Sequence, residues 1–161
     1  MSYDLNIVVV GQENPASISF ETGIELLDET KEALRYHDIW GFMTATHGMW
    51  YALGTFNDGD FSALYILDPD FDTPSDVSPY WVSDNLKSNL VPLRVRSEYR
   101  QDLEKILQIL MARSPLKTLY FTARVQPGDD EIVSGTLSLE QFWELHDKKQ
   151  ILFNVCYILR D

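Results

Sequence analysis

The stretch from Tyr36 to Leu86 constrains the fold most, because it contains no lysine or arginine. It contains eight aspartates, no glutamate and eleven aromatic side chains. Aromatic residues favour strands that are buried on one side, whereas aspartates favour turns. The composition therefore predicts short strands joined by acidic turns. It also suits a surface that attracts a basic partner and then binds it by apolar burial, and both interpretations stay open at this point.

The length and charge of the chain limit its possible functions. At 161 residues with 45% hydrophobic content, residues 1–161 fit a single domain that can bury its own core. The net charge is −12, and the acidity is regional: residues 1–35 hold seven acidic and two basic side chains, whereas residues 87–161 hold ten and eleven. Such a chain lacks the basic surface that nucleic acids and anionic membranes require. We therefore expect a basic protein as partner, with no nucleic acid and no membrane.

Features of the chain that report on its compartment all favour the cytoplasm. No apolar run approaches the roughly 20 residues that span a bilayer. The first residues, Met1 to Asn6, include no lysine or arginine, so we expect no signal peptide. Cys156 is the single cysteine and cannot form a disulfide within the chain. Its apolar neighbours predict a buried thiol rather than a nucleophile.

The N-terminal half predicts strands around one helix. Thr22 and Glu25 have the spacing of a capping box, which predicts a helix from about Gly23 to Tyr36. The turn sequence Asn57-Asp58-Gly59-Asp60 predicts a β-hairpin between its flanking strands. We expect strands, from the period of two, over Leu5–Val10, Phe42–Thr46, Met49–Phe56 and Phe61–Leu67. An ordered surface loop is expected over Asp68–Pro79, which holds three prolines.

The C-terminal half predicts the remaining helices and strands. Apolar residues at three- and four-residue spacing predict a helix from Ser97 to about Pro115. Ser138 and Gln141 form a second capping box, which predicts a helix through about Lys149. We also expect a short helix over Trp81–Asn89, and strands over Leu93–Arg96, Leu116–Val125, Ile132–Leu137 and Ile151–Leu159, the last central because it is apolar on both faces. The fold class is therefore α+β: a mainly antiparallel sheet with about three helices packed on it.

Known patterns for metal and cofactor sites are incomplete in this chain. Asp68, Asp70 and Asp72 alternate as in a calcium-binding loop, but Thr73 stands where that loop needs glycine and Pro79 where it needs glutamate. The three histidines, His37, His47 and His146, include no pair at the spacing of a helical zinc site. Glycine-rich phosphate loops and nucleophile elbows are missing. We expect no cofactor, no metal and no catalytic residue.

The basic cluster of Arg94, Arg96 and Arg100 is small. It could bind a phosphate or an acidic peptide. The stronger expectation is that these arginines pair with the chain's own acidic surface.

The acidic, aromatic profile resembles that of bacterial toxin-immunity proteins, the inhibitors that accompany polymorphic or contact-dependent toxins. The resemblance covers the whole chain as a profile, with the aspartates and aromatics from Asp58 to Trp81 as its main feature. It implies a protein that is not an enzyme and that neutralises a basic toxin domain. Carboxylates would steer and pair with the partner, and aromatic residues would anchor it. The implied partner-binding residues are Asp58, Asp60, Asp68, Asp70, Asp72, Asp76, Trp50, Phe71, Tyr80 and Trp81.

Two other functions fit parts of the sequence. A small enzyme or small-molecule-binding domain could line a pocket with Trp40, Trp50, Tyr51 and His47. An acidic mimic of nucleic acid would need carboxylates along most of the chain, and residues 87–161 are nearly neutral. The pocket is the main alternative, and the mimic ranks below it.

Overall fold

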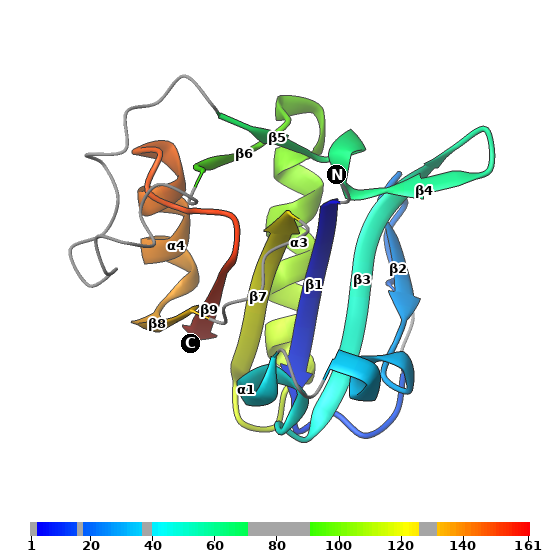
Figure 1. Ribbon diagram of the computed structural model, residues 1–161, viewed down its shortest axis with the longest axis vertical. Coiled ribbons are helices and arrows are strands. Elements are labelled where there is room, and N and C mark those ends of the chain that lie inside the picture. Colours follow the sequence, from blue (N-terminus) through cyan, green and yellow to red (C-terminus); the bar gives the residue numbers. More distant parts are fainter. Residues whose placement is uncertain (1–2, 16–17, 37–39, 71–90, 126–131) are drawn as a thin grey trace.

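The fold is known from a computed structural model. It describes all residues except 1–2, 16–17, 37–39, 71–90 and 126–131. The described residues form an α+β structure, as predicted, with a mainly antiparallel sheet and helices packed on it (Figure 1). The strands are β1 (Tyr3–Val10), β2 (Glu25–Asp28), β3 (Gly48–Asn57), β4 (Asp60–Ser62), β5 (Leu67–Pro69), β6 (Leu93–Val95), β7 (Thr118–Val125), β8 (Ile132–Leu137) and β9 (Val155–Arg160). The α-helices are α1 (Gly41–Thr44), α3 (Ser97–Arg113) and α4 (Leu139–Asp147). Two 3₁₀ helices span Glu32–Tyr36 and Ala63–Tyr65.

The main sheet has seven strands in the described residues, and its central strands come from both halves of the chain. Their order is β2-β3-β1-β7-β9-β8, and β4 also pairs with β3. All neighbours are antiparallel except β8 and β9, which are parallel. A separate two-stranded sheet joins β5 to β6. The final strand lies between β7 and β8, so its predicted central position is confirmed.

One face of the sheet carries the larger core, under α3 and α4. Alternate residues of β1 (Leu5, Ile7 and Val9) are buried there, because side chains in a strand alternate between faces. The α3 side chains at the predicted spacing are buried against this face: Leu103, Ile106, Leu107, Leu110 and Met111. The capping box of Ser138 and Gln141 begins α4, as the sequence predicted.

The opposite face is also covered, which explains the apolar stretches without alternation. Val8 and Val10 of β1 pack there with Trp50 and Cys156, under Met43 of α1. The side chain of Cys156 is buried, as predicted.

The predicted helix from Gly23 to Tyr36 is wrong, because this segment forms β2 and a 3₁₀ helix instead. The hydroxyl of Thr22 accepts a hydrogen bond from the Ile24 N–H (3.2 Å) and donates one to the Asp102 carboxylate of α3 (2.8 Å). The segment is thereby tied to α3 rather than capped as a helix. Residues 25–28 then pair with β3, which supplies the backbone partners that a helix would have supplied.

The predicted strand over Phe42–Thr46 is also wrong, because α1 occupies Gly41–Thr44. The hydroxyls of Thr44 and Thr46 donate to carbonyls four residues earlier, of Trp40 (2.8 Å) and Phe42 (3.0 Å). Hydroxyls that bond to nearby backbone in this way favour short turns and helix ends over strands, and α1 ends after four residues.

The predicted hairpin is confirmed, although its second strand is shorter than expected. The side chain of Ser62 accepts a hydrogen bond from the Leu64 N–H (3.1 Å), and this cap begins a 3₁₀ helix that ends β4. The last predicted strand likewise begins only at Val155. The strand over Leu93–Arg96 is confirmed as β6, whereas the predicted helix over Trp81–Asn89 lies outside the described residues.

Candidate partner-binding surface

Five of the ten predicted partner-binding residues lie in the described part of the chain. The other five lie outside it: Phe71, Asp72, Asp76, Tyr80 and Trp81. The described five do not share one environment. Asp58 and Asp60 are exposed, Asp68 and Asp70 are partly buried, and Trp50 is buried.

Asp68 and Asp70 are engaged by basic side chains of the same chain. The pairing of β5 with β6 places Asp68 opposite Arg94, and the Asp68 carboxylate contacts the guanidinium groups of Arg94 (3.4 Å) and Arg96 (2.9 Å). The Lys149 ammonium lies 3.7 Å from the Asp70 carboxylate. The expectation that the arginine cluster pairs with the chain's own acids is confirmed.

Trp50 lies in the core of the second sheet face, with only 4% of its surface exposed. The Arg124 guanidinium lies 3.4 Å from the Trp40 ring centroid and 5.9 Å from that of Trp50. It also donates a hydrogen bond to the Asn6 side chain (2.6 Å). Stacking of a guanidinium on tryptophan is favourable, so these rings hold the face together and are not presented to a partner.

The predicted aromatic pocket does not assemble around its four residues. Trp50 and His47 line a cavity of about 360 Å³ between β3 and α1. Tyr51 lines a different cavity, of about 480 Å³, because consecutive strand residues point to opposite faces. Trp40 is buried against Arg124 instead of lining either cavity.

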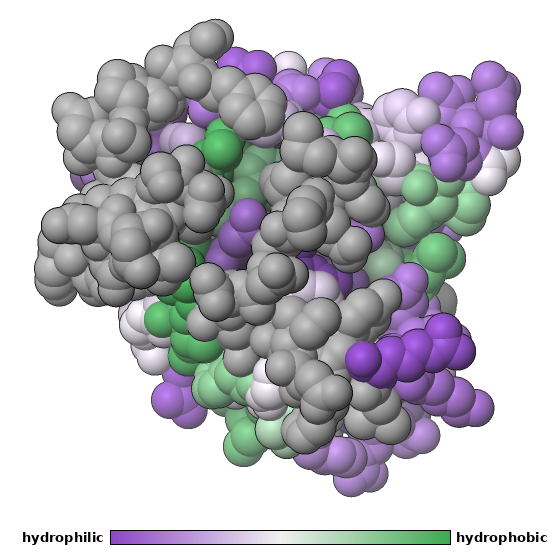
Figure 2. Space-filling view, in the orientation of Figure 1, coloured by the Kyte–Doolittle hydropathy of each residue, from purple (hydrophilic) through white to green (hydrophobic). Residues whose placement is uncertain are grey.

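The β3–β4 hairpin carries the exposed acidic and aromatic residues. Asp58 and Gly59 both have positive φ angles, 51° and 83°, as a two-residue turn of type I′ requires. Phe56 lies opposite Phe61 across the hairpin with ring centroids 5.2 Å apart, and 54% of Phe56 is exposed. The hairpin projects from the sheet (Figure 1), and Figure 2 shows hydrophilic atoms at its tip beside hydrophobic ones.

Phe56 and Phe61 were missing from the predicted site. The sequence contained a signal for them, because each lies immediately outside the Asn57–Asp60 turn and the two therefore face each other across the hairpin. Among the described residues, neither Asp58 nor Asp60 takes part in an ion pair. The tip thus offers two carboxylates and one exposed aromatic ring, that of Phe56, packed against the half-buried Phe61.

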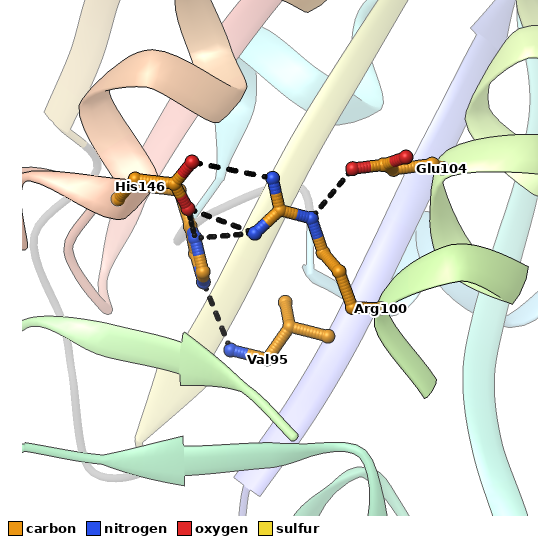
Figure 3. A network of polar contacts seen from close by, with 5 residues as sticks. Val95, Arg100, Glu104 and His146 are labelled. Atoms are coloured by element: carbon orange, nitrogen blue, oxygen red, sulfur yellow. Dashed lines mark hydrogen bonds and ion pairs between the residues drawn. The ribbon is translucent and has the colours of Figure 1, made fainter. Parts of the chain in front are cut away.

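The most connected polar group joins α3, α4 and β6 (Figure 3). The Arg100 guanidinium contacts the carboxylates of Glu104 (2.7 Å) and Asp147 (2.8 Å) and stacks on the Trp143 ring at 4.0 Å. The Val95 N–H donates to Nε2 of His146 (3.0 Å), so the proton of the neutral ring is on Nδ1, 3.0 Å from the Asp147 carboxylate.

The protonation states in this group follow from burial and charge. Burial lowers the pKa of His146, against the hydrogen bond to Asp147, which raises it. The Arg100 and His146 hydrogen bonds hold the pKa of the Asp147 carboxyl at about 2. A neutral histidine whose Nε2 already accepts a backbone hydrogen bond cannot use that nitrogen as a base. The group therefore acts as a structural clamp between α3 and α4.

Two further features are absent from the described residues. Within these ranges, no three His, Cys, Asp or Glu side chains are placed to share a metal ion. No helix in the same part of the chain is long and apolar enough to cross a membrane. The β3–β4 hairpin combines two exposed carboxylates with an exposed aromatic ring, and we take it as the candidate functional surface in the described structure.

We compared the chain with protein-family models, with curated proteins and with solved structures, and it matches none of them.

Proposed function

We propose that this protein is an acidic inhibitor that binds and neutralises a basic partner protein, as the immunity protein of a cognate bacterial toxin does. The observation that carries the proposal is the β3–β4 hairpin tip, where the exposed Asp58 and Asp60 lie between Phe56, which is exposed, and Phe61, which is half-buried against it. Aromatic residues at an interface contribute much of its binding energy, and Phe56 has 54% of its surface available.

The charge of the chain supports the choice of a basic partner. A net charge of −12 attracts cationic surfaces at long range and raises the rate of encounter. The hairpin carboxylates form no ion pair with any described residue, whereas Asp68 and Asp70 already have internal partners. We therefore centre the interface on the hairpin rather than on all the predicted aspartates.

The proposal places the protein in the bacterial cytoplasm and gives it no catalytic role. A single buried cysteine suits a reducing compartment. Inhibition would follow from occupation of the toxin's basic surface by the hairpin.

Affinity capture from a lysate of the source bacterium tests the binding, with the wild type beside two variants. The hairpin variant carries Phe56→Ala, Asp58→Asn and Asp60→Asn. The control variant carries Leu116→Ala, Glu140→Gln and Glu144→Gln, which remove an equally exposed apolar side chain and two exposed carboxylates elsewhere. We expect a basic protein to be retained by the wild type and the control.

The purified partner should then bind the hairpin variant at least about thirtyfold more weakly, because a hot-spot side chain contributes about 2 kcal/mol or more. Expressed alone, this partner should arrest bacterial growth, and co-expressed wild type should restore it. Equal binding by both variants would remove the hairpin from the interface. A partner that does not arrest growth would contradict the immunity role.

A further inference from the structure

Strand β2 forms one edge of the main sheet that the described residues make. The Glu29 N–H donates to the Trp50 carbonyl (2.9 Å), in register with the β2–β3 pairs. Because paired and outward residues alternate in an antiparallel ladder, Leu26 and Asp28 turn their N–H and C=O groups away from β3. Among the described residues, no backbone hydrogen bond reaches these outward groups.

A groove runs beside this edge on the α3 face. It is the cavity of about 480 Å³, and its apolar lining includes Ile18, Phe20, Leu26 and Tyr51. A volume of this size fits one or two side chains of a peptide. The side chains of Leu26 and Asp28 both line the groove, so the strand that offers backbone groups also offers a pocket beside them.

The charge at the edge is negative. Glu25 and Asp28 are exposed residues that contribute to the rim of the groove, and one oxygen of the Asp28 carboxylate accepts hydrogen bonds from the N–H (3.0 Å) and hydroxyl (2.6 Å) of Thr30. The Lys105 ammonium approaches the groove only at the Phe20 ring, 5.7 Å from its centroid. Two carboxylates on a strand of four residues repel the same edge of a second copy, so they deter self-association and favour a cationic strand.

We propose that β2 receives an extended segment of the basic partner as an added strand. The segment's backbone pairs with Leu26 and Asp28, an apolar side chain enters the groove, and flanking lysines or arginines pair with Glu25 and Asp28. This mode of recognition combines backbone hydrogen bonds for affinity with side-chain pockets for specificity. The inference rests on the proposed function, because it names how that partner is bound.

The position of β2 suits a partner that also contacts the hairpin. β2 pairs with residues 51–54 of β3, and β4 pairs with the residues that follow, 55–57. A Cβ built on Gly54 would lie 2.7 Å from the Phe61 ring, so the start of β2 adjoins the aromatic pair. In Figure 1 the hairpin extends to the right at the upper end of β3, above β2.

Nuclear magnetic resonance on the full chain tests the inference with a defined peptide. The probe is a peptide of about nine alternating lysine and valine residues, the length of a long strand. In the free protein the amides of Leu26 and Asp28 should exchange with solvent quickly, and that of Leu27 slowly. With the peptide, the resonances of Leu26 and Asp28 should shift saturably and their exchange should slow.

Two controls separate strand pairing from simple charge attraction. The same peptide with every second backbone nitrogen methylated keeps its charge but loses one edge of donors, and it should not protect Leu26 or Asp28. The variant Glu25→Lys/Asp28→Lys should bind the unmodified peptide at least about tenfold more weakly, whereas Glu140→Lys/Glu144→Lys should bind it as the wild type does.

The outcomes distinguish this inference from the proposed function. Slow exchange of Leu26 and Asp28 in the free protein would mean that the edge is already paired, and would overturn the inference. So would the absence of shifts at β2, or equal protection by the methylated peptide. Shifts confined to residues 58–60 would overturn the β2 edge while leaving the hairpin inhibitor intact. The capture experiment decides the inhibitor separately.

Discussion

Arg100 and Arg94 both pair with carboxylates, but their surroundings differ at the scale of the residue. Arg100 has two short ion pairs and stacks on Trp143, with 27% of its side chain exposed. Arg94 has one contact of 3.4 Å and is 68% exposed. Packing and geometry, rather than charge alone, determine what an ion pair contributes to stability.

Arg100→Ala should therefore lower the free energy of unfolding by about 1–3 kcal/mol, since hydrogen bonds to charged groups and ring stacking are both lost. Arg94→Ala should change it by less than about 0.5 kcal/mol. Urea unfolding of both variants and the wild type measures the difference. Equal losses would show that the α3–α4 contact is no stronger than an ordinary surface pair.

His146 should make the stability depend on pH. Its pKa is lowered in the folded protein, chiefly by burial, so the unfolded chain binds a proton that the folded chain does not. The contribution of the neutral His146 to the free energy of unfolding is then fully present above the unfolded pKa of about 6.5 and is lost as the pH falls below it. The Asp147 carboxyl, with a pKa of about 2, does not titrate in this range.

The urea midpoint of the wild type should fall as the pH is lowered from about 8 to about 5. They should fall less for His146→Gln, which can still accept the Val95 N–H but does not titrate. Parallel pH profiles for the two proteins would show that the histidine is not held neutral by the fold.

At the scale of the element, Gly48 fixes how closely β3 approaches β1. A Cβ built there would overlap the Val9 carbonyl oxygen and would lie 3.1 Å from the Val10 Cα. Both atoms are backbone of a strand that is paired on each side, so no side chain can rotate away.

Gly48→Ala should destabilise the protein by at least about 2 kcal/mol, as overpacking of a rigid core does. Gly135→Ala in the edge strand β8 is the control, because nothing lies within 4 Å of its built Cβ, and its effect should stay within about 0.5 kcal/mol. Thermal or urea unfolding compares the two. Similar stability of the two variants would mean that β3 can shift relative to β1.

The elements that were predicted correctly have long or redundant signals. α3 repeats its buried apolar residues over about two and a half turns, from Leu103 to Met111. Ser138 and Gln141 specify the start of α4 by two reciprocal hydrogen bonds. The helix predicted over residues 23–36 was wrong because Ile24, Leu26 and Leu27 fit both a helix and a strand over so short a run. Pairing with β3 and the Thr22–Asp102 hydrogen bond determine the outcome, and both depend on residues distant in sequence.

Prediction of the candidate site from the sequence was limited in the same way, by contacts between residues that are distant in the chain. The hairpin tip could be predicted from the sequence, because its turn residues lie directly between the two strands that they join. The burial of Trp50 was not, because it depends on Arg124 and on the position of α1 across the second sheet face. The pairing of Asp68 with Arg94 was foreseen only as a general tendency of the arginines, since the β5–β6 register spans 26 residues.

At the scale of the whole molecule, the surplus of negative charge acts against folding. A net charge of −12 repels itself more strongly in the compact state than in the unfolded chain. Raising the salt concentration from about 0.01 M to about 1 M shortens the Debye length from about 30 Å to about 3 Å and screens this repulsion. The melting temperature of the free protein should therefore rise with salt.

A variant with four exposed carboxylates replaced by amides tests the cause. Glu25→Gln, Glu32→Gln, Asp60→Asn and Glu144→Gln change the net charge from −12 to −8 and should reduce the rise. An equal rise in the variant would assign the effect to salt acting on apolar burial rather than on charge.

Salt should weaken the complex with a basic partner, although it stabilises the free protein. Screening stabilises the free protein but weakens attraction between oppositely charged surfaces, so the Kd should increase with salt while the melting temperature of the free chain also increases. Isothermal titration at several salt concentrations measures the first trend, and thermal melts of the free chain measure the second. If binding is independent of salt, the carboxylates at β2 and the hairpin are not at the interface, and the apolar contacts alone hold the partner. A Kd and a melting temperature that both rise with salt would mean that the same carboxylates that destabilise the free chain are used to bind the partner.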